Sequence, residues 1–138
     1  MAGALPSEEL RGSETILVVE DEDLVRQMVR EILVQYGYSV LESRSGGEAV
    51  DLCSRHQGTI HLMLTDVVMP GMSGVELSKR LAPMQPEMKV LFMSGYTANA
   101  VVHQGILDPG VAFIHKPFSI ASLAHKVREV LGSGAATN

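Results

Sequence analysis

The stretch Ile16–Leu33, ILVVEDEDLVRQMVREIL, joins a short apolar run to an amphipathic segment through four acidic residues. Its first four residues are all apolar and mostly β-branched, which is typical of a strand buried on both faces. Apolar residues after the acidic turn recur at helical spacing, and Asp23 is placed to cap that helix at its N-terminus. The stretch therefore predicts one strand–turn–helix unit of a parallel α/β sheet.

The same unit recurs four more times along the chain. Strands that alternate with helices predict a single-domain, doubly wound α/β fold with right-handed crossovers and helices on both faces. Serines serve as further caps, and Ser45 with Glu48 three residues later has the capping-box pattern. The predicted strands cover residues 16–19, 38–41, 60–64, 89–93 and 111–114, and the predicted helices lie within residues 23–37, 45–53, 73–83, 99–104 and 119–131.

Length and composition indicate one compact domain. The chain has 138 residues, 46% of them hydrophobic, and a formal net charge of −5. A negative chain with 4% aromatic residues and no basic block is a poor candidate for direct nucleic-acid binding. No apolar run reaches the ~20 residues of a membrane span. We therefore expect no membrane insertion. The single cysteine, Cys53, excludes an internal disulfide, which suits a reducing compartment, so we expect a cytoplasmic location.

The two ends of the chain differ in composition from the part between them. Residues 1–13 mix small, acidic and proline residues without a period, and residues 132–138 are small and polar. We expect an N-terminal linker or tail over residues 1–13, a folded domain over residues 14–131 and a flexible C-terminal tail over residues 132–138.

Polar residues follow the predicted strands at the sheet edge where doubly wound folds bind ligands. Glu20 and Asp21 follow the first strand, Asp66 ends the third, Ser94 follows the fourth and Lys116 the fifth. If the first and third strands are neighbours, the three carboxylates lie within a few ångströms of one another. Two unit charges at ~4 Å repel by about 4 kcal/mol at an effective dielectric of ~20. Such a cluster favours a hard cation, Mg²⁺ first.

The acidic cluster indicates phosphoryl chemistry, because Mg²⁺ shares its coordination with phosphate oxygens. Asp66 is the predicted nucleophile, since a carboxylate can attack phosphorus and form an aspartyl phosphate. Lys116 is a flexible cation suited to a carboxylate or a phosphoryl oxygen. The Ser94 hydroxyl can donate to a phosphoryl oxygen, and Gly95 permits close backbone approach.

Taken together, these motifs resemble the receiver domain of two-component response regulators. The resemblance rests on Glu20-Asp21, LTDVVMPGMSG around Asp66, FMSGY around Ser94 and FIHKPF around Lys116. It covers residues 15–131, and the MSGY, ILDPG and HKPF patterns look most like receiver domains attached to hybrid sensor histidine kinases. The resemblance implies a (βα)5 flavodoxin-like sandwich with a five-stranded parallel sheet in the order 2-1-3-4-5.

For the acidic cluster, the resemblance implies one role for each residue. Asp66 is similar to the phosphoacceptor and Asp21 to the direct Mg²⁺ ligand. Glu20 is similar to a ligand that acts through a water molecule, and the backbone carbonyl of Val68 to the third protein ligand.

A second group of residues is similar to the switch of the family. Ser94 occupies the switch hydroxyl position and Lys116 that of the family's lysine, with a cis bond expected between Lys116 and Pro117. Phe113 stands where receivers carry a rotameric aromatic and, lacking a hydroxyl, would act by packing. Tyr96 is placed to cover part of the site. Phosphorylation is then expected to change the surface formed by the fourth helix, the fifth strand and the fifth helix.

The implied partners are a histidine kinase or histidine phosphotransfer domain as phosphoryl donor and a protein as downstream target, with a homodimer formed on phosphorylation as one form of output. The domain would assist its own phosphotransfer and dephosphorylation without being a turnover enzyme by itself. Two alternatives stay open: a pseudo-receiver that binds partners without phosphorylation, and a receiver fragment of a hybrid histidine kinase.

Two other classes of protein fit the sequence less well. A phosphatase that uses an aspartyl phosphate usually carries a second acid two residues after the nucleophile, where this chain has Val68. A flavodoxin-type binder needs a loop rich in Gly, Ser or Thr after the first strand. Here that loop is the acidic run Glu20–Asp23, which repels phosphate in the absence of a metal.

Overall fold

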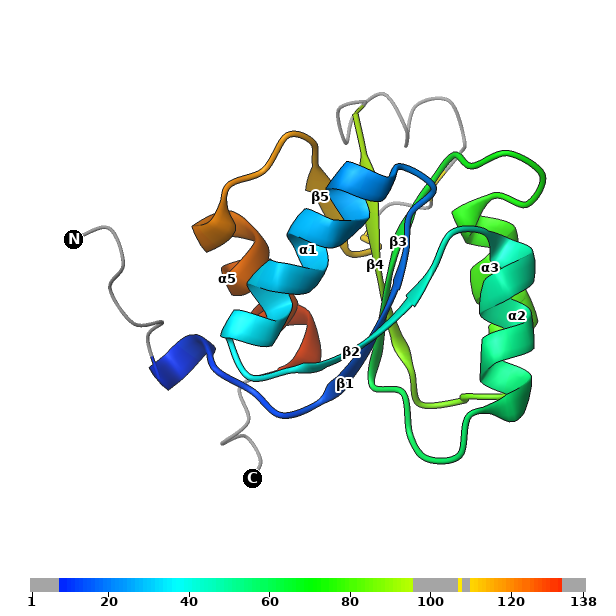
Figure 1. Ribbon diagram of the computed structural model, residues 1–138, viewed down its shortest axis with the longest axis horizontal. Helices are drawn as coiled ribbons and strands as arrows, with labels where there is room; N and C mark the ends of the chain where they lie inside the picture. Colours follow the sequence, from blue (N-terminus) through cyan, green and yellow to red (C-terminus); the bar gives the residue numbers. More distant parts are fainter. Residues whose placement is uncertain (1–7, 96–106, 108–109, 133–138) are drawn as a thin grey trace.

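The computed structural model describes residues 8–95, 107 and 110–132. A five-stranded parallel sheet in the order β2-β1-β3-β4-β5 forms its centre (Figure 1). This order confirms the predicted doubly wound α/β fold. The strands are β1 (Thr15–Val19), β2 (Ser39–Ser43), β3 (Leu62–Asp66), β4 (Lys89–Ser94) and β5 (Phe113–His115).

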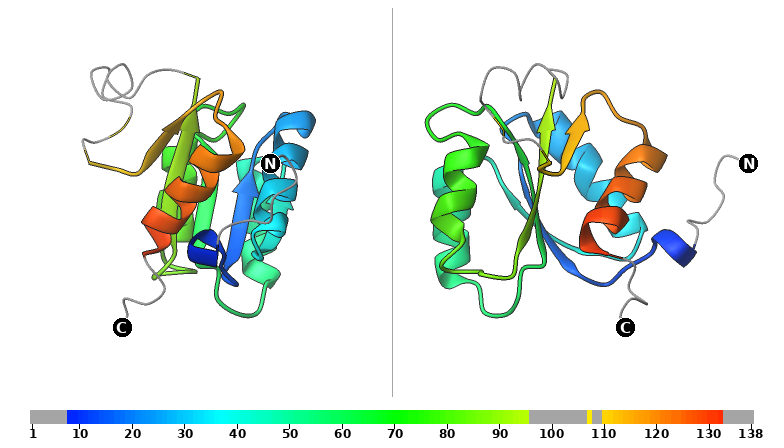
Figure 2. Two further views of the ribbon diagram at one scale, coloured as in Figure 1. Left: turned by 90° about the vertical axis from the view of Figure 1, so that its left-hand side faces the viewer. Right: turned by 180° about the vertical axis from the view of Figure 1, so that it is seen from behind.

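Helices cover both faces of the sheet (Figures 1 and 2). Helices α1 (Asp23–Gln35) and α5 (Ile120–Leu131) lie on one face, and α2 (Gly46–Arg55) and α3 (Gly74–Leu81) lie on the other. The helix predicted at residues 99–104 lies outside the described residues.

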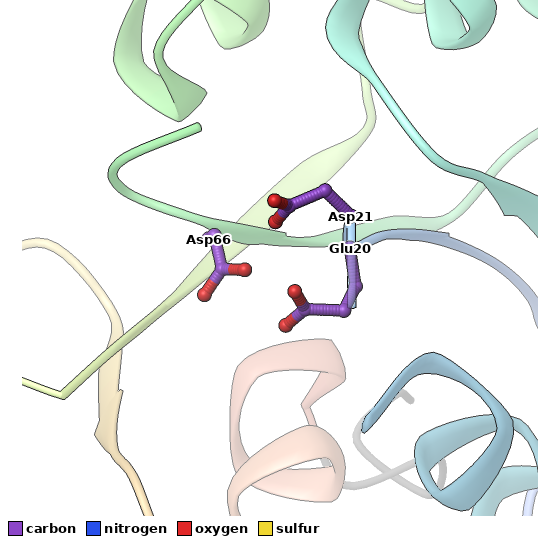
Figure 3. Close-up of side chains that lie close together, drawn as sticks. All are labelled: Glu20, Asp21 and Asp66. Carbon is purple, nitrogen blue, oxygen red and sulfur yellow. The ribbon is translucent and has the colours of Figure 1, made fainter. Parts of the chain in front are cut away.

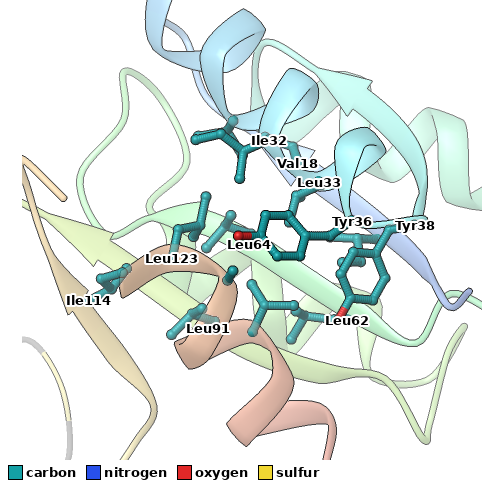
Figure 4. Packing of buried hydrophobic residues seen from close by; sticks show 14 of the residues in the cluster. Val18, Ile32, Leu33, Tyr36, Tyr38, Leu62, Leu64, Leu91, Ile114 and Leu123 are labelled. Atoms are coloured by element: carbon teal, nitrogen blue, oxygen red, sulfur yellow. The ribbon is translucent and has the colours of Figure 1, made fainter. Parts of the chain in front are cut away.

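Each face of the sheet has its own hydrophobic core. Ile16 and Val18 of β1 point into the core under α1 and α5, whereas Leu17 and Val19 point into the core under α2 and α3. Successive side chains of a strand alternate between the faces, so a strand covered on both sides needs the continuous apolar run that the sequence has. Figure 4 shows the first of these cores, which includes Leu33, Leu64, Leu91 and Leu123.

Serine side chains cap three helices. Ser45, Ser73 and Ser119 each accept a hydrogen bond from the backbone N–H three residues later. The box at Ser45 is only half formed, because the Glu48 carboxylate accepts from the N–H of Arg44 at 2.9 Å rather than from that of Ser45.

The predicted cap of α1 is wrong. The N-cap residue is Glu22, which makes no side-chain cap bond, and Asp23 is the first residue of the helix. The Asp23 carboxylate instead accepts a hydrogen bond from Arg26 Nη2 at 2.6 Å. This pairing holds the carboxylate beside the first turn of α1, where its negative charge still interacts favourably with the helix dipole.

Strand boundaries differ from the prediction by up to two residues. The strand β3 begins at Leu62 rather than at residue 60, and β5 covers 113–115 rather than 111–114. Directly before β3, the side chain of His61 serves as the hydrogen-bond acceptor for the first residue of β1: its Nδ1 accepts from the N–H of Thr15 at 3.0 Å.

A short 3-10 helix, η1 (Glu8–Leu10), precedes β1 and packs on the domain. Leu10 lies against the core under α1 and α5, and the N–H of Gly12 donates to Tyr36 O at 3.0 Å. Arg128 of α5 donates from Nη2 to Glu14 Oε2 at 2.7 Å. These contacts fasten the chain before β1 to α1 and α5.

Candidate functional site

Three carboxylates converge at the carboxyl ends of β1 and β3. One carboxylate oxygen each from Glu20, Asp21 and Asp66 lies within 4.8 Å of the other two (Figure 3). The two strands are direct neighbours, so their ends reach the same edge of the sheet. Glu20 and Asp66 are buried, whereas Asp21 is exposed at the mouth of the cluster. The structure thus brings together the acids that the sequence placed at these strand ends.

Lys116 joins this cluster from the loop that follows the edge strand β5. Its Nζ lies 2.7 Å from Asp66 Oδ1 and 2.9 Å from Glu20 Oε1, so one ammonium bridges two carboxylates. The backbone N–H of Lys116 donates to Ser94 O at 2.7 Å, which anchors the end of β5 to the end of β4. The bond between Lys116 and Pro117 is cis, as expected.

The protonation of the cluster follows from burial and from this shared ammonium. Burial and the neighbouring Glu20 raise the pKa of Asp66 from 3.8 to about 7, although Lys116 opposes the rise. Burial also opposes ionisation of Glu20, but hydrogen bonds from Asp66, Lys116 and the Glu22 N–H outweigh it and lower the pKa of Glu20. Burial likewise disfavours the Lys116 ammonium, yet its two carboxylate partners raise the pKa of Lys116. Without a metal, the carboxyl group of Asp66 therefore holds its proton up to about pH 7.

The loop after β3 is held close to the sheet by its backbone. The N–H of Val67 donates to Met93 O at 3.0 Å, and the N–H of Gly74 donates to Val67 O at 2.8 Å. A Cβ atom at Gly74 would clash with the backbone carbonyl of Asp66. Only glycine permits α3 to begin this close to the strand that carries Asp66.

The other residues predicted for the site lie at different places in the fold. Ser94 is buried at the end of β4, and Val68, 63% exposed, lies in the loop directly after β3. Phe113 of β5 is half-buried, pairs in register with Phe92 of β4 and packs on a small separate cluster. Tyr96 lies outside the described residues.

Sequence reasoning missed two residues that shape the site. Gly74 could have been suspected from its place directly after the capping Ser73. Arg26 gave no such signal, because an arginine on the polar side of an amphipathic helix is ordinary. In the structure its Nη1 donates to the backbone oxygen of Glu20 at 2.8 Å.

The cluster has the chemistry that Mg²⁺ requires. The three acids offer carboxylate oxygens, which are hard ligands, and the cluster contains neither histidine nor cysteine. No helix within the described part of the chain is both long and apolar enough to cross a membrane.

Comparison with known proteins identifies the family. The response regulator receiver domain model matches residues 16–128, so the chain belongs to that family and is a receiver domain of two-component systems. The chain is 40% identical over 123 residues to the sensor kinase CckA of Brucella abortus. That match covers 89% of this chain but only 13% of the kinase.

Solved structures agree with this assignment. The receiver domain of the hybrid histidine kinase CckA is 38% identical, with a TM-score of 0.72 over 86% of this chain and 99% of that one. The response regulator TrrA of Thermotoga maritima, solved in complex with Mg²⁺-BeF, is 27% identical, with a TM-score of 0.68 over 85% and 98%. The resemblance that the motifs indicated is confirmed, including the likeness to receivers of hybrid histidine kinases.

Proposed function

We propose that this domain accepts a phosphoryl group from a phosphohistidine onto Asp66 in a Mg²⁺-dependent reaction. The surroundings of Asp66 support the proposal best. Lys116 Nζ lies 2.7 Å from the Asp66 carboxylate, and two more carboxylates lie beside it in the cluster at the strand ends. A surface cluster of acids would not need a half-buried lysine that contacts two of its carboxylates.

The step proposed for Asp66 is a displacement at phosphorus. A carboxylate oxygen of Asp66 attacks phosphorus, the P–N bond to the donor imidazole breaks, and its electron pair returns to the ring nitrogen, which takes a proton from solvent. Lys116 stabilises the ionised carboxylate before attack and is within reach of an oxygen of the transferred group. The Ser94 hydroxyl is a donor for a second oxygen.

The acidic residues have a separate part in this proposal. Asp21, Asp66, the Val68 carbonyl and, through a water molecule, Glu20 would hold Mg²⁺, which neutralises charge on the transferred phosphoryl group. Glu20 also keeps Lys116 in place, because its Oε1 accepts from Nζ at 2.9 Å. Water that attacks the aspartyl phosphate then returns the domain to its starting state.

We further propose that phosphorylation shifts the population of two states of the surface around β5 and α5. The added group on Asp66 carries nearly two negative charges and three acceptor oxygens at the end of β3, and Ser94 ends the neighbouring strand β4. A Ser94 side chain drawn towards these oxygens vacates space that the half-buried Phe113 can fill by rotation. The fourth helix predicted for this surface lies outside the described residues.

The phosphoryl donor needs an approach to the acidic cluster, and an apolar groove beside Lys116 supports a proposal for its place. A groove of about 350 Å³ opens beside Lys116 and is lined by apolar side chains of α1 and of the β5–α5 loop. We propose that a helix of a histidine kinase or histidine phosphotransfer domain lies there, with the reaction taking place in the cytoplasm. The groove is lined by Val25, Met28, Lys116, Pro117 and Phe118.

Binding of beryllofluoride, a mimic of the phosphoryl group, tests this function without a donor protein. With Mg²⁺ and beryllofluoride together, we expect the melting temperature of the wild type to rise, and that of Asp66→Asn to stay unchanged. The matched control is Asp51→Asn, the same change at an exposed position of α2, which should respond like the wild type. A wild type that shows no Mg²⁺-dependent response would favour a pseudo-receiver that works without phosphorylation.

A further inference from the structure

We infer that Arg26 is a positioning residue that fixes the turn presenting Glu20 and Asp21 to the metal. This inference rests on the proposed function, because it concerns the same Mg²⁺ site. Arg26 acts through the backbone of the turn and touches none of the groups that would react.

The guanidinium of Arg26 is buried, with 11% of the side chain exposed, and contacts three separate elements. Its Nη1 donates to the backbone oxygen of Glu20 at 2.8 Å, directly after β1. Its Nη2 donates to Asp23 Oδ1 at 2.6 Å in the first turn of α1, and its Nε lies 3.4 Å from Glu42 Oε1 of β2. The rigid fork of arginine can serve three acceptors at once, which the single ammonium of lysine cannot do in this geometry.

The turn between β1 and α1 needs such a clamp. It has three residues, all of them acidic, and two of them belong to the cluster, where their carboxylates repel each other and that of Asp66. The backbone of Glu20 is held on both sides: its N–H donates to Ser43 O at 3.1 Å, and its oxygen accepts from Arg26. Because this oxygen belongs to the peptide unit that leads into Asp21, the bond from Arg26 sets the orientation of that unit. The exposed Asp21 carboxylate takes its direction from it.

Charge and position predict opposite effects when Arg26 is removed. Arg26 contacts the backbone oxygen of Glu20 rather than its carboxylate, so it takes no ligand atom away from a metal. As a nearby positive charge it repels Mg²⁺, so loss of the charge alone would tighten binding. Loss of the clamp would loosen the turn and weaken binding. The sign of the change in Mg²⁺ affinity therefore separates the two explanations.

The experiment measures the Mg²⁺ dissociation constant by calorimetry for the wild type, Arg26→Gln, Arg26→Lys and Arg30→Gln. Arg30 is the matched control: it lies one turn further along α1, its Nε is 3.1 Å from Glu42 Oε2, and its side chain is 45% exposed. We expect Arg26→Gln to bind Mg²⁺ about tenfold more weakly, at the low end of the effect of outer contacts on metal sites. Arg30→Gln should bind as the wild type does or slightly more tightly.

The lysine variant provides the second test, because it keeps the charge and loses the fork. We expect Arg26→Lys to bind Mg²⁺ more weakly than the wild type as well, and amide NMR signals of residues 20–22 to move in both Arg26 variants before metal is added. All titrations are made below the melting temperature of each variant. If the glutamine variant does not fold, the lysine variant decides.

The outcomes separate the two claims. A wild type that binds no Mg²⁺ would defeat the proposed function itself. A wild type that binds, beside Arg26 variants of unchanged or higher affinity, would leave the function intact and overturn the inference, even if those variants melt earlier. Equal weakening in Arg30→Gln would also overturn it, since the effect would then not be specific to the clamp.

Discussion

Replacing Asp66 with asparagine should stabilise the metal-free domain near neutral pH. In the wild type, the Lys116 ammonium bridges the Asp66 and Glu20 carboxylates. Burial and the neighbouring Glu20 raise the pKa of Asp66 from 3.8 to about 7. Asparagine has the shape of the protonated acid. It keeps an oxygen that accepts from Lys116 and an N–H that donates to Glu20, so the variant retains the contacts without the second charge.

The size of the effect follows from the two pKa values of Asp66. The folded state keeps this proton up to about pH 7, whereas the unfolded chain loses it near pH 3.8. The contribution of Asp66 to stability is therefore complete below about pH 4 and is lost as the pH rises to about 7. The asparagine variant has no proton to lose. At about 1.4 kcal/mol per pH unit, the variant gains up to roughly 4 kcal/mol, and between pH 5 and pH 8 its advantage grows by roughly 2 to 3 kcal/mol.

Urea unfolding in EDTA at several pH values between 5 and 8 measures this effect. Circular dichroism is the suitable signal, because the chain has no tryptophan. Asp51→Asn on the exposed face of α2 is the control, and its difference from the wild type should not change with pH. A free-energy difference for Asp66→Asn that is constant with pH, or an asparagine variant that is the less stable protein at pH 8, would refute this reasoning.

Three further changes have expected outcomes. Gly74→Ala should lower the free energy of unfolding by about 1 to 3 kcal/mol, because a Cβ there meets the backbone of β3. Lys116→Met should raise the pKa of Asp66 above its wild-type value, since the ammonium 2.7 Å away is lost; carboxyl-carbon NMR measures this. Arg128→Ala should cost about 1 to 3 kcal/mol in urea unfolding, because it breaks a largely buried ion pair with the segment before β1.

Each of these changes has a control or a contrary result. Gly47→Ala adds the same methyl group in α2, where the nearest atom is 3.9 Å away, and should not destabilise. Arg55→Ala removes an exposed pair with Asp51 and should cost less than about 1 kcal/mol. Equal losses at each matched pair of positions, or an unchanged Asp66 pKa in Lys116→Met, would contradict the explanation.

Much of the fold could be predicted because local patterns and one topological rule agree. The apolar run at 16–19 needs a sheet covered on both faces, and parallel strands put their carboxyl ends on one edge. Glu20, Asp21 and Asp66 could therefore be placed together from their positions after strands. Lys116 followed from the same rule.

The remaining features depend on contacts between distant segments. Asp23 pairs with Arg26 instead of capping α1. This pairing depends on the position of the Arg26 guanidinium, which also contacts the Glu20 carbonyl and Glu42, and no local spacing in the sequence encodes those contacts. The need for glycine at position 74 arises from the approach of α3 to β3, which is a tertiary distance.

Intact mass after incubation with acetyl phosphate and Mg²⁺ tests the central claim most directly. We predict one added phosphoryl group on the wild type, none on Asp66→Asn, and none on the wild type when EDTA precedes the donor. A phosphoryl group that also appears on Asp66→Asn, or that forms in EDTA, would contradict the assignment of Asp66 as the acceptor at a metal site.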